Sequence, residues 1–129
     1  MKPNKLEIEA VSKLQPFDRY KYFIKKVADS EKMFTLVDNF ENYLISTLEE
    51  NKLFPLWSSE EFALNCIVDG WANAKIKEIS VNDFLNETSN FILKNNYLVN
   101  VFPLTYTTGF IVTNEEFTRD LKVELENYE

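Results

Sequence analysis

Apolar residues recur along the chain with two different periods, and each period predicts its own kind of element. Over residues 5–14 and 16–28 they return every three or four positions, which is typical of helices with one buried face, and Pro16 suits the first turn of the second helix. Over residues 33–38 and 41–48 β-branched and aromatic residues dominate, with the turn-forming pair Asp38-Asn39 between them. We therefore expect two helices and a β-hairpin, followed by a third short strand over residues 53–57.

One local pattern then appears three times: an apolar residue, a Ser or Thr, two further residues, an acid and a Phe. The copies are WSSEEF at residues 57–62, ISVNDF at 79–84 and VTNEEF at 112–117. Ser58, Ser80 and Thr113 are predicted to cap three helices, over residues 59–69, 81–95 and 114–127, with the acid closing a capping box. The apolar residue before each cap and the Phe four after it have the spacing of a hydrophobic staple. A duplicated module is the alternative reading, but the unequal spacing between copies favours convergence on good capping chemistry.

The elements together predict an α+β fold in one domain of 129 residues. Further strands are expected over residues 75–79, 97–104 and 110–112, which makes about five helices around a small, mostly antiparallel or mixed sheet of about six short strands. Pro55 is expected at an edge or a bulge, and Pro103 at an edge or a strand end, because proline cannot donate a ladder hydrogen bond. Gly70 suits a helix C-cap. Residues 1–15 form a helical extension that packs on the domain or flanks it.

The charge of the chain is negative and unevenly placed. The net charge is −7, with +3 over residues 1–32 and −10 over residues 33–129. This balance argues against nucleic acid and against an anionic membrane as ligands, and it suits a basic protein partner; solubility is the alternative explanation. Lys21, Lys25 and Lys26 share one face of the second helix, which is read as the solvated face of a core helix rather than a membrane-binding face. One cysteine, no apolar run long enough to span a bilayer and no secretion signal predict a cytoplasmic protein.

Several short motifs resemble one known family. The segment LFPLW at residues 53–57, Phe62-Ala63, Trp71 and Val101-Phe102-Pro103 are similar to a small bacterial family, the domain of unknown function 2750. The resemblance covers residues 16–125 and implies a hairpin, a Pro-apolar-Trp segment, a helix, a strand, a second helix and an apolar-Phe-Pro strand. Ser58 departs from the proline that members often have after the tryptophan. The family brings no established activity, so the resemblance implies no site residues.

The residue types present exclude several kinds of chemistry. The chain has no histidine and one cysteine, which excludes His-based triads and effectively excludes a structural zinc site. Cys66 lies on the buried stripe of a predicted helix, where a small hydrophobe is a better reading than a nucleophile. Gly70 and Gly109 are isolated, so no phosphate-binding loop is expected. We predict no cofactor and no metal.

Paired carboxylates are the remaining source of catalytic chemistry. They occur at residues 49–50, 60–61 and 115–116, and two carboxylates can serve as acid and base. Two of these pairs belong to predicted capping boxes and the third to a turn, so we predict no catalytic residue. Glu115, Glu116 and Asp120 also lack the dense ligand spacing of a calcium loop.

Aromatic residues near the ends of elements are the candidates for partner binding. Trp71, Tyr97 and Tyr106 lie outside clear buried stripes, and Trp and Tyr are enriched in binding hot spots. The favoured hypothesis is a non-catalytic acidic module of the immunity or inhibitor type that binds a protein partner. The alternatives are a small enzyme that uses carboxylates or Tyr in a cleft, and a homo-oligomeric structural component. The sequence leaves the oligomeric state open.

Overall fold

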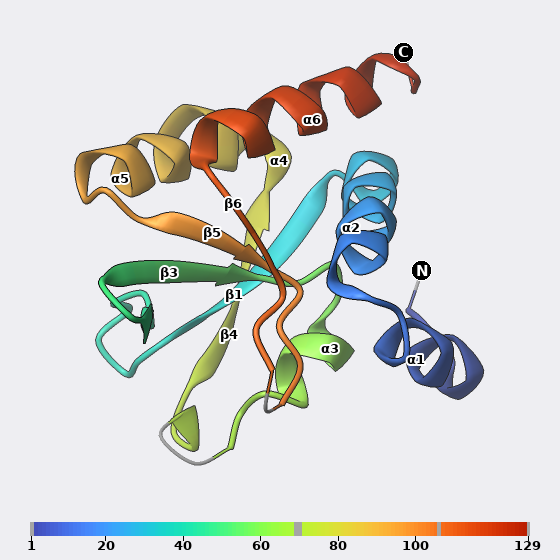
Figure 1. Ribbon diagram of the computed structural model, residues 1–129, viewed down its shortest axis with the longest axis horizontal. Coiled ribbons are helices and arrows are strands. Elements are labelled where there is room, and N and C mark those ends of the chain that lie inside the picture. The colour runs from blue at the N-terminus through green and yellow to red at the C-terminus, as the bar shows by residue number, and fades with distance from the viewer. Residues whose placement is uncertain (1, 69–70, 106, 129) are drawn as a thin grey trace.

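The computed structural model describes residues 2–68, 71–105 and 107–128. Within these residues it contains five helical segments and six strands, which confirms the α+β fold (Figure 1). The helices are α1 (Lys5–Ser12), α2 (Pro16–Ser30), α3 (Glu60–Leu64), a continuous segment of α4 (Val81–Asp83), the π-helical turn η2 (Phe84–Thr88) and α5 (Ser89–Lys94), and α6 (Asn114–Glu126). The strands are β1 (Lys32–Val37), β2 (Ser46–Leu48), β3 (Asn51–Leu56), β4 (Lys75–Ser80), β5 (Leu98–Val101) and β6 (Phe110–Val112).

The strands form two small sheets rather than one. Strands β1 and β4 pair antiparallel, whereas the other sheet has the order β2-β3-β5-β6, with β3 and β5 parallel. The sheets meet where Phe34 and Trp57 exchange two backbone hydrogen bonds of 2.9 Å. The predicted mixed sheet is confirmed in this divided form.

The hairpin predicted from residues 33–48 forms only next to its turn, where Val37 and Tyr43 make an isolated antiparallel bridge and Leu44 N donates to Leu36 O at 3.0 Å. The chain does turn after β1, since Asp38 N donates to Asn42 O at 2.9 Å, but β1 pairs along its whole length with β4. Strand β2 begins only at Ser46 and pairs with β3. The last five residues of β1 are buried, so this strand needs a full-length partner, and β4 supplies one.

Pro55 lies in an interior strand, so its predicted edge position is also wrong. Strand β3 runs between β2 and β5, but β2 covers only residues 51–53 of it. Leu56 O accepts from Phe102 N, so the nitrogen of Pro55 faces away from β5, on the side where Thr35 Oγ1 donates to Pro55 O at 2.7 Å. The absence of an N–H group on Pro55 therefore removes no hydrogen bond between β3 and β5. Pro103, just beyond β5, confirms the expectation of a strand end.

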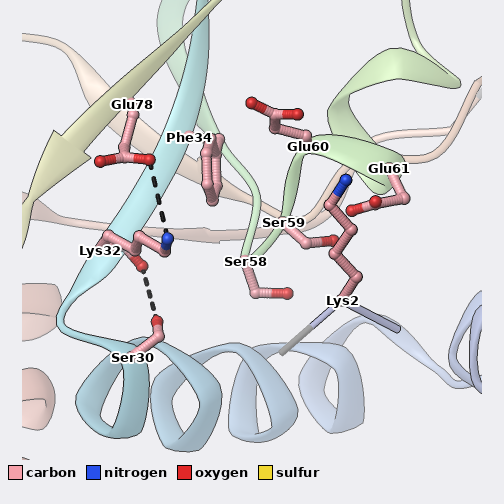
Figure 2. A pocket seen from close by; sticks show the side chains of 9 residues that line it. All are labelled: Lys2, Ser30, Lys32, Phe34, Ser58, Ser59, Glu60, Glu61 and Glu78. Atoms are coloured by element: carbon pink, nitrogen blue, oxygen red, sulfur yellow. Dashed lines mark hydrogen bonds and ion pairs between the residues drawn. The ribbon is translucent and has the colours of Figure 1, made fainter. Parts of the chain in front are cut away.

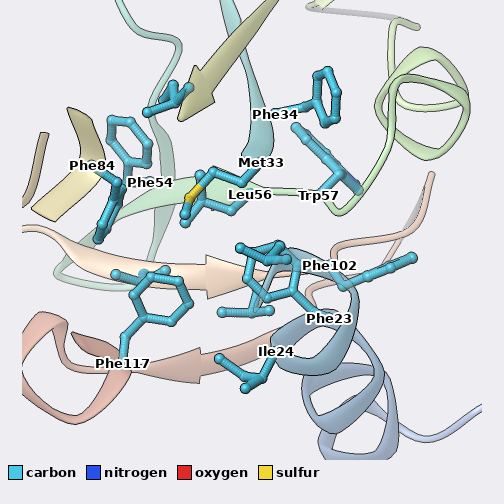
Figure 3. Packing of buried hydrophobic residues seen from close by; sticks show 14 of the residues in the cluster. Phe23, Ile24, Met33, Phe34, Phe54, Leu56, Trp57, Phe84, Phe102 and Phe117 are labelled. Carbon is cyan, nitrogen blue, oxygen red and sulfur yellow. The ribbon is translucent and has the colours of Figure 1, made fainter. Parts of the chain in front are cut away.

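Aromatic rings fill the core between the sheets and the helices (Figure 3). The ring centroid of Phe117 lies 5.2 Å from that of Phe84 and 5.8 Å from that of Phe23. Phe102 packs on Phe62 at 4.6 Å. Each fully buried ring contributes about 2 kcal/mol of transfer free energy. The contacts of Phe117 join α6 to α2 and to the η2 turn, and the contact of Phe62 with Phe102 joins α3 to the end of β5.

Two of the three predicted caps are confirmed. Ser80 Oγ accepts from Asp83 N at 3.0 Å, and Thr113 Oγ1 accepts from Glu116 N at 3.1 Å. The first copy differs: α3 begins at Glu60, and its N-cap is Ser59, with no side-chain hydrogen bond. The backbone pairing between Trp57 and Phe34 keeps the chain extended, so the prediction of Ser58 as the cap is wrong. Helix α3 also ends at Leu64, well short of residue 69, and the Gly70 cap falls outside the described residues.

Helix α1 contacts α2 through both apolar and polar side chains. Val11 is buried with the core cluster. The Tyr22 hydroxyl donates to the Glu7 carboxylate, and Lys26 Nζ lies 3.4 Å from the same carboxylate. These contacts hold the extension against the first long helix.

Candidate functional site

The aromatic residues predicted to bind a partner do not form one surface. Trp71 is half-buried and packs edge-on against Trp57, with centroids 6.5 Å apart. Trp57 directly follows the carboxyl end of β3, whereas Tyr97 directly precedes the amino end of β5. Because β3 and β5 are parallel and in register, the two sites lie at opposite ends of this pair. Tyr106 is outside the described residues, so a role for it stays a prediction.

Tyr97 belongs to a row of three rings at its end of the molecule. Its centroid lies 5.9 Å from that of Phe91 in α5, and Phe91 lies 5.1 Å from Tyr43. Lys77 Nζ sits 5.5 Å from the Tyr43 centroid. Phe91 is partly exposed, so the row presents apolar surface beside the turn that precedes Tyr43.

That turn, residues 38–42, is here named the Phe40 turn. The Asp38 carboxylate accepts from Phe40 N at 2.8 Å, from Asn42 N at 3.0 Å and from Asn42 Nδ2 at 3.3 Å. Glu41 has a positive φ of 65°, which bends the chain back. An aspartate that bonds to the backbone two and four residues on is a compact way to fix a turn from within.

The Phe40 turn presents an aromatic side chain to solvent. Phe40 is 84% exposed, the highest value among the large apolar side chains that the structure describes. The backbone bond from Asn42, followed by that from Phe40, lowers the pKa of Asp38 below its ordinary value, so the carboxylate is ionised at neutral pH. Asp38-Asn39 indicated a turn in the sequence, but phenylalanine is usually buried, so nothing there marked Phe40 as exposed.

A hollow of about 450 Å³, lined mostly by lysine, serine and glutamate residues, lies beside the start of α3 (Figure 2). Lys32 Nζ is 3.8 Å from Glu78 Oε1 on its rim, and the hydroxyls of Ser58 and Ser59 are buried with no hydrogen-bond partner among the described residues. Its carboxylates, by contrast, lie at the surface or half-buried. A general acid normally needs a desolvated carboxyl, so the acids of this hollow are poorly placed for carboxylate catalysis. It is lined by Lys2, Ser30, Lys32, Phe34, Ser58, Ser59, Glu60, Glu61 and Glu78.

Cys66 is buried in the core rather than presented to a substrate. It is 6% exposed, and its Sγ donates to Pro103 O at 3.5 Å. Burial raises the pKa of the thiol to about 11, so it is protonated at neutral pH. Since the thiolate is the nucleophile, this geometry agrees with the reading of Cys66 as a small hydrophobe.

Carboxylates do not gather into a metal site in the described part of the chain, where no group of three or more His, Cys, Asp or Glu could hold an ion. Glu116 instead accepts a hydrogen bond from the Thr113 hydroxyl at 3.2 Å, as part of the α6 cap. Asp120 accepts from the Tyr20 hydroxyl at 2.6 Å. These acids therefore have structural partners.

The comparison with protein families matches residues 20–121 to the model described as "Protein of unknown function (DUF2750)". The chain belongs to this family. The DUF2750 match runs from α2 into α6, so the Phe40 turn, the ring row and the lining of the hollow apart from Lys2 lie inside it, whereas α1 lies before it. A comparison with curated proteins finds no match. No helix in the described residues is long and apolar enough to cross a membrane.

Proposed function

We propose that this protein is a non-catalytic binding module of the immunity or inhibitor type, which holds a basic protein partner at the Phe40 turn. The observation that carries the proposal is the 84% exposure of Phe40 on a turn fixed by Asp38. A large aromatic side chain held away from its own core is the usual anchor of a protein interface.

The internal bonds of the turn favour binding because they reduce its entropic cost. Ordering a flexible loop at an interface costs free energy that a pre-formed loop has already lost on folding. Asp38 holds both the Phe40 and the Asn42 backbone N–H groups, so the turn has its bound shape before the partner arrives. The ring row from Tyr43 to Tyr97 extends the apolar surface next to it.

Charge supports a basic partner. Asp38 lies two residues before Phe40 and Glu41 directly after it, and residues 33–129 carry −10. A field of one sign attracts a partner of the opposite sign and raises the association rate, most strongly at low salt. The aromatic anchor then supplies affinity, while the surrounding acids supply steering and selectivity.

The test is quantitative capture of partners from the source cells with three tagged chains: wild type, Phe40→Ala and Leu6→Ala. Leu6 is 76% exposed on α1, which makes it a matched control for loss of an exposed apolar side chain. We expect one basic protein on the wild type, weakened at high salt, retained by Leu6→Ala and reduced roughly tenfold or more by Phe40→Ala.

Two outcomes would contradict the proposal. One is capture of the same protein equally by Phe40→Ala and wild type, which would place the interface elsewhere. The other is no enrichment of any basic protein over the controls at low salt, in purified and folded samples checked by circular dichroism.

A further inference from the structure

A groove between α2 and α6 shares no lining residue with the Phe40 turn and has a different character. Its volume is about 350 Å³, and its lining is mainly apolar. Phe17 on α2 is 52% exposed and Val123 on α6 is 58% exposed, so two large apolar side chains face solvent at one place. The lining comprises Phe17, Tyr20, Lys21, Ile24, Lys25, Asp120, Val123 and Glu124.

The floor of the groove is held firmly. Tyr20 packs on Phe110 at 4.9 Å, and Phe17 packs on the same ring at 5.3 Å. The Tyr20 hydroxyl donates to Asp120 Oδ2 at 2.6 Å, which ties the two helices together across the floor. A pre-formed apolar floor needs little ordering when another surface covers it.

The two walls of the groove carry opposite charges. Lys21 and Lys25 lie along the α2 wall, and Asp120 and Glu124 lie along the α6 wall. Lys25 and Glu124 form no ion pair with any residue in the described part of the chain. The groove thus presents a basic edge, an apolar centre and an acidic edge, in that order.

We propose that this groove is a dimer interface and that its occupant is a second copy of the chain. A two-fold axis along the groove sets the basic wall of each copy against the acidic wall of the other, so the same charge pairing forms twice. The two apolar centres then cover each other. A partner of a single charge sign would be repelled by one wall, whereas this surface is complementary to itself.

Charge reversal provides the sharpest test. In Lys25→Glu the new carboxylate faces Glu124 of the other copy, and in Glu124→Lys the new ammonium group faces Lys25, so each variant alone sets like charges against each other twice. In the heterodimer of the two variants, the glutamate at position 25 of one chain faces the lysine at position 124 of the other, and the second pair is the native Lys25 with the native Glu124. We expect each variant alone to raise the dimer dissociation constant roughly tenfold or more, and the mixture to recover most of that loss.

The measurements are light scattering after size exclusion over a concentration series, and native mass spectrometry of the mixture, with one variant carrying a tag so that the heterodimer has its own mass. Phe17→Ala and Val123→Ala should weaken the dimer by a similar factor. Leu64→Ala on α3, with 59% exposure, and Phe40→Ala should leave it unchanged. These last controls separate the dimer from the proposed partner surface.

Three results would overturn the proposal. The first is a wild-type chain that stays monomeric up to about 1 mM, since a dissociation constant above that corresponds to less than about 4 kcal/mol of binding. The second is a dimer that survives both single charge reversals, which would place the contact on another surface. The third is a mixture of the two variants that forms no heterodimer although circular dichroism shows both chains folded.

Discussion

The Phe40 turn and the connection between β5 and β6 are both surface segments, but opposite means hold them in place. The first is fixed by Asp38, a residue of the turn itself. The second is fixed by side chains from distant parts of the chain: Trp57 Nε1 donates to Pro103 O at 2.8 Å, and Arg19 reaches two of its carbonyls. The first arrangement needs little beyond its own five residues, whereas the second exists only in the folded protein.

Arg19 is the centre of the second arrangement. It is 3% exposed and donates to the carbonyl oxygens of Leu14, Phe102 and Thr108. A buried cation is costly unless its hydrogen-bonding capacity is used, and here backbone carbonyls use it. Arg19 thereby joins the α1–α2 connection to the end of β5 and the loop beyond it.

The same connection contains a backbone conformation that no local preference explains. Phe102 is buried with a φ of 64°, which is rare for a bulky residue. Gly109 packs so closely against the preceding strand that a Cβ atom there would lie 2.0 Å from Val101 O, while its N–H donates to Asn100 Oδ1 at 2.8 Å. Long-range contacts therefore hold strained backbone in place, and changes in them should affect the whole fold.

The largest effect is expected from Arg19→Ala. It leaves three carbonyls without their donor and opens a cavity, so we expect a loss of about 4 kcal/mol in the free energy of unfolding, measured by urea denaturation. Arg119→Ala, at an exposed position, is the matched control and should change this free energy by less than about 0.5 kcal/mol. Similar stabilities for the two variants would show that the carbonyls around Arg19 do not depend on it.

A smaller loss is expected from Gly109→Ala. The new methyl group collides with backbone rather than with a side chain that can rotate, so β5 and β6 must separate, at a cost of about 2 kcal/mol. The control is Thr108→Ala, which changes an exposed side chain at the preceding position. If the Gly109→Ala chain has the same melting temperature as the wild type, the backbone around this contact relaxes at no cost and the prediction is wrong.

The smallest effect on global stability is expected from Asp38→Ala, because the Phe40 turn is held locally. Hydrogen exchange at the Phe40 and Asn42 amides should speed up, while that of β1 stays unchanged. The pKa of Asp38 is lowered in the folded chain, so its contribution is present at neutral pH and is lost as the pH falls through that lowered pKa. Acid should therefore accelerate exchange at these two wild-type amides as the variant does, after correction for intrinsic rates. Faster exchange throughout β1 would contradict the local character of the turn.

The repeated capping pattern shows which helix starts the local sequence predicts correctly and which it does not. Thr113 and Ser80 cap their helices as predicted, since each cap needs only a backbone N–H three residues on. Ser58 has the same neighbours in sequence, but the pairing of Trp57 with Phe34 holds the chain extended and moves the helix start to Glu60. A single tertiary contact therefore prevents the cap that the local pattern predicts.

The candidate site was predictable only in part. Asp38-Asn39 indicates the turn, and Tyr97 lies at the end of an element, but no local pattern marks Phe40, because its exposure depends on what the rest of the fold covers. Trp71 and Tyr97 have similar sequence signals, yet the parallel pairing of β3 with β5 places them at opposite ends. The spacing of residues along a chain does not encode that separation.

The sequence by itself determined the kinds and order of the elements, the family and most helix starts, because these follow from periodicity and from contacts three or four residues apart. Only the tertiary structure decided that β1 pairs with β4, that Pro55 lies in an interior strand and that Arg19 is buried among carbonyls. Each of these depends on groups that are dozens of residues apart. Such groups meet only when burial of the aromatic core brings their elements together, and no local pattern carries that information.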